Sequence, residues 1–438
     1  MSEVSQAAHQ TKHVDALNTL AAGVHRASRA LARQPSSAKD DALTQIAAAL
    51  RARTDAILEA NRRDLEAGKD KGLEEAFLDR LRLDAGRIEK IASAVEEIVA
   101  LSDPVGRVDQ TWVRPNGLRV GRRRIPLGVV GIIYESRPNV TSDAAALCLK
   151  SGNGVILKGG SDAFQSNRAV FEAIQAGLAA SELDEAATPA VGFVDTTDRG
   201  AVRAMLGLDR YIDVIIPRGG KGLISFVSEH SRIPVIKHDE GVCHVVVDGS
   251  ARPEVVDDIV LNAKTQRPGV CNALETLLVL DNAVDIHLAR LLERLSKAGV
   301  QLHLCERSAP IARRAGLDAS QFAPADEQAY QAEYLSLELA VRVVDDLSQA
   351  IEHIDTYGSR HTESLLTEDY TQSERFQSEV DSSVVMINAS TRFADGNQLG
   401  LGAEIGISTT RMHAYGPMGI DELTTTKFVV LGTGQIRQ

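Results

Sequence analysis

The hydrophobic pattern changes character near residue 125. Within residues 14–102, apolar side chains recur at helical spacing, as Leu17, Leu20 and Val24 illustrate, and strand-like runs are absent. Beyond that point, continuous apolar runs such as residues 127–133 alternate with amphipathic segments. Helical spacing predicts packed amphipathic helices, whereas short unbroken apolar runs predict buried strands.

The strand-like runs are separated by helical segments. Strands are predicted at residues 127–133, 154–158, 190–194, 212–216, 234–236 and 244–247. A helix is predicted over residues 142–150 with Ser142 as its N-cap, and others end near Ala180 or follow residues 218–222. Buried strands alternating with helices indicate a parallel sheet covered on both faces, with ligands at the carboxyl ends of its strands.

The alternation resumes in the second half of the chain. A helical pattern covers residues 253–265, and strands are predicted at residues 275–280, 300–304, 340–344 and 383–388. These elements are enough for a second α/β domain.

A hairpin interrupts the first half. Asn116-Gly117, flanked by residues 111–113 and 118–120, is a strong hairpin signal. Residues 122–124 are all Arg and lie on the outgoing strand, either as a solvated sheet edge or as an anion contact. Residues 425–436 are β-rich and could pair with this hairpin or with another subunit.

Cys271 lies on a turn broken by Pro268 and Gly269, between the helical pattern of residues 253–265 and the strand of residues 275–280. A thiol on a rigid turn can attack a carbonyl carbon if its pKa is lowered or a base is near. The alternative is that Cys271 is a small buried hydrophobic residue.

Composition narrows the class of protein. The chain has 438 residues, 44% hydrophobic and 25% charged, as expected of a globular protein of two or three domains. Its four cysteines form no disulfide framework or zinc motif, which favours a reducing, cytoplasmic compartment. The polar start of the chain and the absence of a long apolar run predict no signal peptide or membrane span. The net charge of -12 argues against general nucleic-acid binding.

Several motifs, in this order and spacing, resemble the aldehyde dehydrogenase superfamily over nearly the whole chain. They are residues 134–143, 158–161, 241–244, 266–273, 384–393 and 400–408. Within the superfamily, the chain is similar to the reductases that act on L-glutamyl 5-phosphate. The cofactor domain of this superfamily lacks the GxGxxG motif, and the sequence contains none.

The resemblance implies an α/β fold with two α/β domains and an oligomerisation element. Residues 1–105 and 126–240 are expected to form a Rossmann-like NADP-binding domain, and residues 241–410 a catalytic domain. Residues 106–125 and 411–438 are expected to join subunits into a homodimer or homotetramer.

The resemblance also assigns roles to single residues. Cys271 is the nucleophile, and Asn139, with the backbone N–H of Cys271, binds the substrate's carbonyl oxygen. Candidate NADP contacts are Lys158, Ser161, Gly219, Gly220 and Glu338. Candidate contacts for the substrate's phosphate or carboxylate are Arg392, His361 and Arg411. No metal is expected. A turn at Asn139, a solvated Lys158 and a simple glycine turn at residues 219–220 remain alternatives.

The expected activity is NADPH-dependent reduction of L-glutamyl 5-phosphate through a cysteine thioester, in L-proline biosynthesis, with transient contact with glutamate 5-kinase. Hydrolytic relatives use a glutamate to activate water, and here the nearest acid is Glu240, in the run of residues 238–241. We interpret Glu240 as structural or incidental. The alternative functions are a hydrolytic aldehyde dehydrogenase that depends on Glu240 and a silent nucleotide-binding scaffold.

Overall fold

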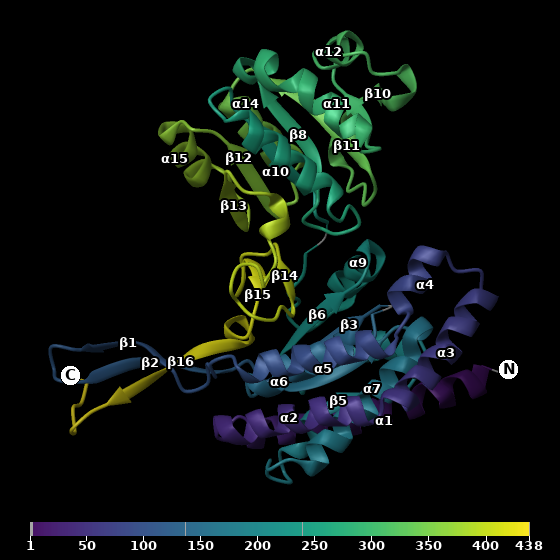
Figure 1. The fold of residues 1–438 in the computed structure, drawn as a ribbon. Helices are drawn as coiled ribbons and strands as arrows, with labels where there is room; N and C mark the ends of the chain where they lie inside the picture. The colour runs from purple at the N-terminus through teal and green to yellow at the C-terminus, as the bar shows by residue number, and fades with distance from the viewer. Residues whose placement is uncertain (1–2, 136, 239, 438) are drawn as a thin grey trace. The chain divides into compact units, whose positions relative to one another are not determined.

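The computed structural model describes residues 3–135, 137–238 and 240–437. Ser136, in the quoted motif of residues 134–143, and Asp239, in the run of residues 238–241, lie outside the described residues. The chain divides into two compact units. The first comprises Met1–Lys237, Leu401–Gly406 and Met418–Gln438, and the second His238–Gly400 and Ile407–Pro417. Both are α/β, which confirms the predicted fold class (Figure 1).

The first unit contains a four-stranded parallel sheet of order β5-β4-β3-β6. Its strands are β3 (Val129–Tyr134), β4 (Gly154–Gly159), β5 (Val191–Phe193) and β6 (Val214–Arg218). Its helices are α1 (Glu3–Leu31), α2 (Ser36–Ala52), α3 (Thr54–Asp70), α4 (Glu75–Leu81), α5 (Ala85–Val99), α6 (Asn139–Lys150), α7 (Phe164–Ala180), α8 (Gly200–Met205) and α9 (Lys221–His230). The strand order reverses between β3 and β6, so their carboxyl ends form a topological switch point.

Several predictions in this unit are wrong. The strand predicted at residues 212–216 is found at Val214–Arg218, and residues 234–236 contribute only an isolated bridge at Val235. β3 begins at Val129 rather than at residue 127, because Gly128 has a φ of 128° that extended backbone does not adopt. α6 begins at Asn139, and Ser142 lies inside the helix, where its hydroxyl donates to the Asn139 carbonyl (2.8 Å). Pro138 is the N-cap residue, and its ring carries no acceptor that could cap the first N–H groups of the helix.

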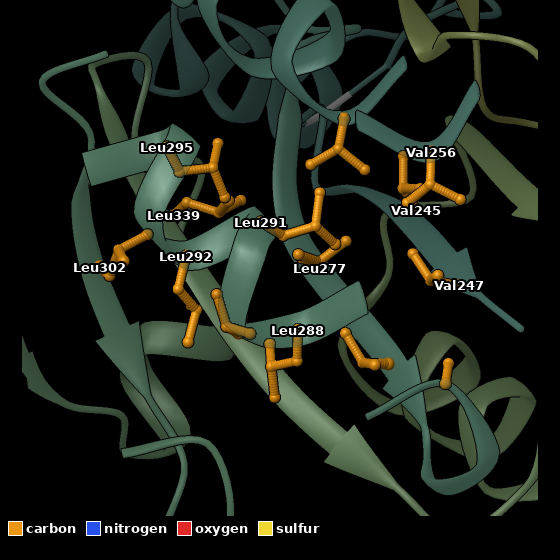
Figure 2. Packing of buried hydrophobic residues seen from close by; sticks show 14 of the residues in the cluster. Val245, Val247, Val256, Leu277, Leu288, Leu291, Leu292, Leu295, Leu302 and Leu339 are labelled. Carbon is orange, nitrogen blue, oxygen red and sulfur yellow. The ribbon is translucent and has the colours of Figure 1, made fainter. Parts of the chain in front are cut away.

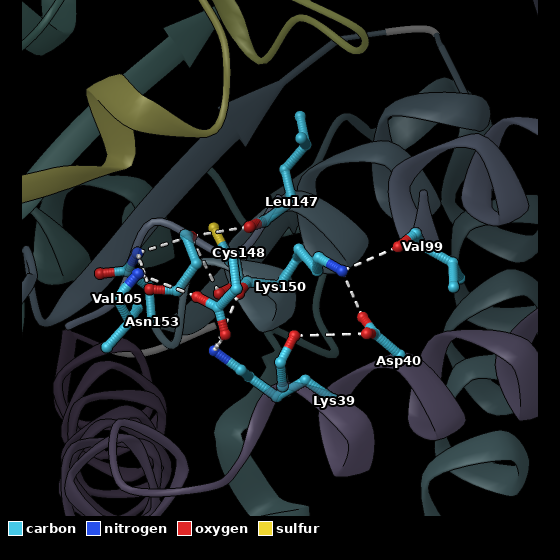
Figure 3. A network of polar contacts seen from close by, with 11 residues as sticks. Lys39, Asp40, Val99, Val105, Leu147, Cys148, Lys150 and Asn153 are labelled. Atoms are coloured by element: carbon cyan, nitrogen blue, oxygen red, sulfur yellow. Dashed lines mark hydrogen bonds and ion pairs between the residues drawn. The ribbon is translucent and has the colours of Figure 1, made fainter. Parts of the chain in front are cut away.

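A buried polar network ties α2 and α6 to the end of α5 (Figure 3). Lys150 is 1% exposed, and its Nζ bonds Asp40 and donates to the Val99 carbonyl (2.8 Å). Lys39, equally buried, pairs with Asp103 and donates to the Lys150 carbonyl (3.1 Å). Because both ammonium groups have anionic and carbonyl partners, these contacts offset the free-energy cost of removing the two charges from water.

The second unit contains a seven-stranded parallel sheet of order β10-β9-β11-β8-β7-β12-β13. The strands are β7 (Cys243–Val247), β8 (Leu274–Leu280), β9 (Gln301–Leu304), β10 (Phe322–Pro324), β11 (Glu338–Val344), β12 (Thr362–Leu366) and β13 (Val384–Ile387). Its helices are α10 (Pro253–Thr265), α11 (Ala289–Lys297), α12 (Ala309–Arg314), α13 (Glu327–Gln331), α14 (Leu347–Tyr357) and α15 (Tyr370–Glu379). Leu277, Leu291 and Leu339 pack with Val245 and Val256 in its main core (Figure 2).

Two features of this sheet differ from the sequence analysis. The run of strands along the chain groups residues 244–247 with the first sheet, whereas the expected catalytic domain, residues 241–410, contains them, and β7 indeed lies between β8 and β12 in the second sheet. The strand β12 is not predicted from the sequence, because its first residues are polar and do not form an apolar run. Glu363 of β12 is fully buried and accepts hydrogen bonds from the backbone N–H (2.9 Å) and Nδ1 (2.8 Å) of His244. A polar sequence can therefore form a central strand when partners satisfy it.

A three-stranded antiparallel arm belongs to the first unit and extends beyond its helices (Figure 1). It consists of β1 (Val108–Val113), β2 (Arg119–Pro126) and β16 (Thr424–Leu431). The predicted hairpin is confirmed, with Gly117 at a φ of 86°. The tail pairs with the hairpin of its own chain, from Thr424↔Pro126 to Leu431↔Arg119.

The arm's central strand is β2, so the prediction that residues 122–124 lie on a solvated edge is wrong. Arg124 pairs with Asp109 (2.9 Å), and Arg122 donates to the Thr426 hydroxyl (2.8 Å). The arm keeps large apolar side chains in solvent: Trp112 is 36% exposed and Phe428 66%. Among the described residues, no helix is long and apolar enough to cross a membrane. The strands β14 (Gly406–Ser408) and β15 (Gly416–Met418) each have residues in both units.

Candidate active site

Cys271 lies on the turn between α10 and β8, as the sequence predicts, and its side chain is partly exposed. This turn is at the amino edge of the second sheet, where Leu274 pairs with Cys243, the first residue of β7. Glu338 opens the adjacent strand β11. The predicted nucleophile of this unit therefore lies at the amino edge of its sheet, opposite to the carboxyl ends where ligands usually bind in parallel sheets.

Gly241 packs directly against the backbone of Cys271. A Cβ at residue 241 would lie 1.9 Å from the Cys271 carbonyl oxygen and 2.6 Å from its Cα. The Gly241 N–H donates to Glu333 Oε1 (3.0 Å), which fixes the loop before β7. Only glycine permits this approach, so the Cys271 turn is held against a second backbone segment.

Cys243 and His361 lie beneath the turn. The Cys243 thiol donates to the Cys271 carbonyl (3.2 Å) and lies 3.7 Å from His361 Nδ1. Burial raises the pKa of Cys243 well above its ordinary value, and burial likewise raises the pKa of Cys148. These two thiols therefore stay protonated and are poor nucleophiles, in contrast to the partly exposed Cys271. His361 is fully buried, with its Nδ1 beside the Cys243 thiol and 2.8 Å from Thr362 Oγ1.

A buried ion pair joins the two elements that flank the turn. Lys264, on α10, and Glu275, on β8, are 0% exposed, and their Nζ and Oε2 atoms are 2.6 Å apart. Burial raises the pKa of Glu275 to about 7 and lowers the pKa of Lys264, although each charge favours the other. The pair links the end of the helix to the start of the strand, so it fixes the ends of the Cys271 turn.

The segment around Arg392 is attached to both sides of the turn. Arg392 Nε donates to Gln266 Oε1 (2.8 Å), and Asn272 Nδ2 donates to the Ala394 carbonyl (2.9 Å). The structure therefore brings Arg392 and Cys271 together, two residues that lie far apart in the sequence.

The other two candidates in this unit, Glu338 and Arg411, bond side chains outside the Cys271 turn. Glu338 Oε2 is 3.2 Å from His303 Nε2, and its Oε1 accepts from Ser336 (2.9 Å). Arg411 pairs with Asp381. The acid that contacts the loop beside Cys271 is Glu333, which the sequence analysis missed, because only the fold brings it to Gly241.

In the first unit, candidates gather at the carboxyl ends of β3, β4 and β6, as predicted for this sheet. Asn139 opens α6 after β3, and its Nδ2 donates to Asp143 Oδ2 (2.9 Å). Lys158 is 4% exposed, and its Nζ donates to the Gly159 carbonyl (2.8 Å). Burial lowers the pKa of Lys158. Ser161 is exposed at the start of the short helix that precedes α7.

The glycine turn at Gly219 and Gly220 holds a carboxylate. The Gly220 N–H donates to Glu135 Oε2 (2.9 Å), and a Cβ at Gly219 would lie 2.5 Å from the same oxygen. Because Gly220 immediately precedes α9, this carboxylate lies at a helix N-terminus. The start of α9 therefore accepts an anion, and glycine at residue 219 is needed for the carboxylate to approach the backbone this closely. Among the described residues, no group of His, Cys, Asp and Glu is arranged to hold a metal ion.

No family model matches the chain. It is 53% identical over 428 residues to gamma-glutamyl phosphate reductase of Geobacter metallireducens, covering 96% of this chain and 99% of the relative. The corresponding protein of Geotalea daltonii is 54% identical with the same coverage. The crystal structure of gamma-glutamyl phosphate reductase from Thermotoga maritima superposes with a TM-score of 0.92 at 45% identity, covering 96% and 99%. An acetylating aldehyde dehydrogenase from Geobacillus thermoglucosidasius (TM-score 0.70, 16% identity, 98% and 99% covered) shares the fold.

Proposed function

Because this chain belongs to the gamma-glutamyl phosphate reductase family, we propose that it reduces L-glutamyl 5-phosphate to L-glutamate 5-semialdehyde and phosphate, a step of proline biosynthesis. The single observation that carries the proposal is the placement of Cys271. Its thiol is partly exposed on a turn held by Gly241 and by the buried pair beneath it, while Cys148 and Cys243 are buried.

The proposed chemistry begins with attack of the Cys271 thiolate on the acyl carbon of the substrate. The new S–C bond forms as the C–O bond to phosphate breaks, and the electron pair leaves with the phosphate. NADPH, when bound, supplies the hydride that reduces the resulting thioester carbonyl. The S–C bond then breaks, the semialdehyde is released and the thiolate is regenerated. The covalent intermediate divides one difficult step into easier ones.

During attack, the carbonyl oxygen gains negative charge that hydrogen-bond donors must stabilise. We assign this role to the Asn139 amide and the backbone N–H of Cys271. One such donor contributes about 3 kcal/mol of transition-state stabilisation. Of the substrate-contact candidates, Arg392 is attached to the Cys271 turn. Arg411 remains a candidate for the amino-acid end, and we reassign the buried His361 to positioning the turn.

The first unit carries groups that match the chemistry of a dinucleotide. Its glycine turn accepts a carboxylate at the start of α9, directly after β6, and Lys158 lies near the end of β4, which β3 separates from β6. A helix N-terminus and a cation at the same edge of a sheet both attract phosphate groups. We therefore propose that Lys158, Ser161, Gly219 and Gly220 would hold NADP, with Glu338 as a candidate ribose contact.

The arm supports a proposal about assembly. A shallow groove of about 480 Å³ on the arm is lined mostly by apolar and Arg side chains, among them Trp112 and Leu431. Exposed apolar surface of this kind is typical of a protein interface. We propose that residues 106–125 and 411–438 join subunits into a symmetric homodimer or a tetramer, the commonest closed assemblies.

The test of the proposed activity is reduction of NADP by glutamate 5-semialdehyde, measured with and without inorganic phosphate. We expect turnover only when phosphate is present, because phosphate must cleave the thioester in this direction. Acid formation at the same rate without phosphate would contradict the proposal and favour a hydrolytic aldehyde dehydrogenase.

A further inference from the structure

Two guanidinium groups lie beside Cys271 without a carboxylate partner. Arg267 is four residues before Cys271 on the same turn and is exposed. Arg392 is partly exposed and is brought to the turn by the fold. Within residues 3–135, 137–238 and 240–437, neither forms an ion pair with an acid, although many other arginines in these ranges do.

The position of Arg392 is fixed by contacts on both sides. Ser390 Oγ donates to Asn262 Oδ1 on α10 (2.8 Å) and accepts from the Arg392 N–H (3.3 Å). On the other side of Arg392, Asn272 Nδ2 donates to the Ala394 carbonyl. The Arg392 side chain itself bonds Gln266, which adjoins Arg267. The Arg392 side chain is therefore held beside the Cys271 turn and does not rotate freely into solvent.

The electrostatics of this site are those of an anion-binding site. Burial lowers the pKa of Arg392, and the neighbouring charge of Arg267 lowers it further, whereas Asp395 and Cys271 act in the opposite direction. Two adjacent cations repel each other, and the repulsion is relieved when an anion binds between them. Guanidinium groups match the oxygens of phosphate and carboxylate in geometry.

We propose that Arg267 and Arg392 form a phosphate subsite, which binds the phosphoryl group of the acyl phosphate and stabilises the phosphate as it leaves. The identity of the anion rests on the proposed function. The phosphate is bonded to the carbon that the thiol attacks, so it must lie beside Cys271, where the two arginines are. The substrate's α-carboxylate lies at the far end of the molecule, four carbons away from that carbon.

The first test measures the charge of the subsite without any substrate. Cys271 is alkylated with iodoacetate, which is anionic, and with iodoacetamide, which is neutral, and the rates are followed on the Cys271 peptide by mass spectrometry. The ratio measured is the iodoacetate rate divided by the iodoacetamide rate. We expect Arg267→Gln and Arg392→Gln each to lower this ratio by about fivefold. Inorganic phosphate should slow iodoacetate in the wild type. Because iodoacetamide also senses thiol pKa, the ratio isolates the attraction of the anion.

Two controls make this test decisive. Arg252→Gln changes an exposed arginine of the same unit that pairs with Glu368, and should leave the ratio unchanged. Arg392→Lys keeps the charge and should keep most of the ratio, so a loss in Arg392→Gln alone is not a folding defect. A ratio unchanged in both Gln variants would overturn the subsite even if the enzyme is an active reductase.

The second test identifies the anion. In the reverse direction, we expect both Gln variants to raise the KM for phosphate about tenfold or more while the KM for glutamate 5-semialdehyde changes less than threefold. A rise in the semialdehyde KM alone would show that the pair binds the carboxylate instead and would overturn the phosphate assignment. If no variant or wild type turns over this substrate, the proposed function fails, whereas the alkylation ratio still decides whether the anion subsite exists.

Discussion

The contact between Gly241 and Cys271 makes Gly241→Ala the sharpest test of how the nucleophile is positioned. The added Cβ would lie 1.9 Å from the Cys271 carbonyl oxygen, and Cβ contacts under 3.0 Å essentially do not occur, so the two backbones must separate by about 1 Å. A displacement of about 1 Å at a reacting group costs roughly 100-fold in rate. We therefore expect kcat/KM to fall about 100-fold, equivalent to about 2.7 kcal/mol of transition-state stabilisation.

The assay is phosphate-dependent reduction of NADP by glutamate 5-semialdehyde, with thermal unfolding measured on the same samples. Gly23→Ala is the matched control, because Gly23 lies within α1 and a Cβ there meets nothing within 4 Å. This control should keep full activity and stabilise the fold by up to about 1 kcal/mol. If Gly241→Ala folds and retains kcat/KM within threefold of the wild type, the reasoning that this close approach positions the thiol is refuted.

Four further predictions concern chemistry, stability and assembly. Cys271→Ser should abolish turnover without loss of folding, whereas Cys148→Ser should stay active; more than a few per cent of wild-type rate in Cys271→Ser would contradict the covalent mechanism. Glu240→Gln should leave phosphate-dependent turnover largely intact, and a collapse in its rate would instead favour the hydrolytic alternative. The pKa of His353 is lowered to about 2 by burial and by the charges of His244 and Arg342. Below about pH 6.5 the folded state therefore binds fewer protons than the unfolded chain, and the free energy of unfolding falls as the pH drops. Between pH 7 and 5.5 this effect amounts to about 1.2 kcal/mol, and urea unfolding of His353→Gln should show that much less pH dependence. Light scattering should give a mass of at least twice the single-chain 47.1 kDa, and a mass near 47.1 kDa would contradict assembly through the arm.

Much of the fold could be predicted because its signals are local. The helix at residues 253–265 and the hairpin at Asn116-Gly117 depend on spacing and turn chemistry within a few residues. The wrong predictions lie where contacts with a distant part of the chain determine the local structure. β12 is polar yet central, because Glu363 finds its donors on His244 of a neighbouring strand.

The sequence by itself determined the fold class, the family and the turn that carries Cys271, because motifs and hydrophobic spacing are properties of short segments. Only the tertiary structure decided what surrounds that thiol. Gly241 presses against its carbonyl, and Arg392 is attached to its turn although the two are far apart in the chain. These contacts depend on the order of strands in the sheet, which places the amino ends of β7 and β8 side by side and which no local pattern encodes.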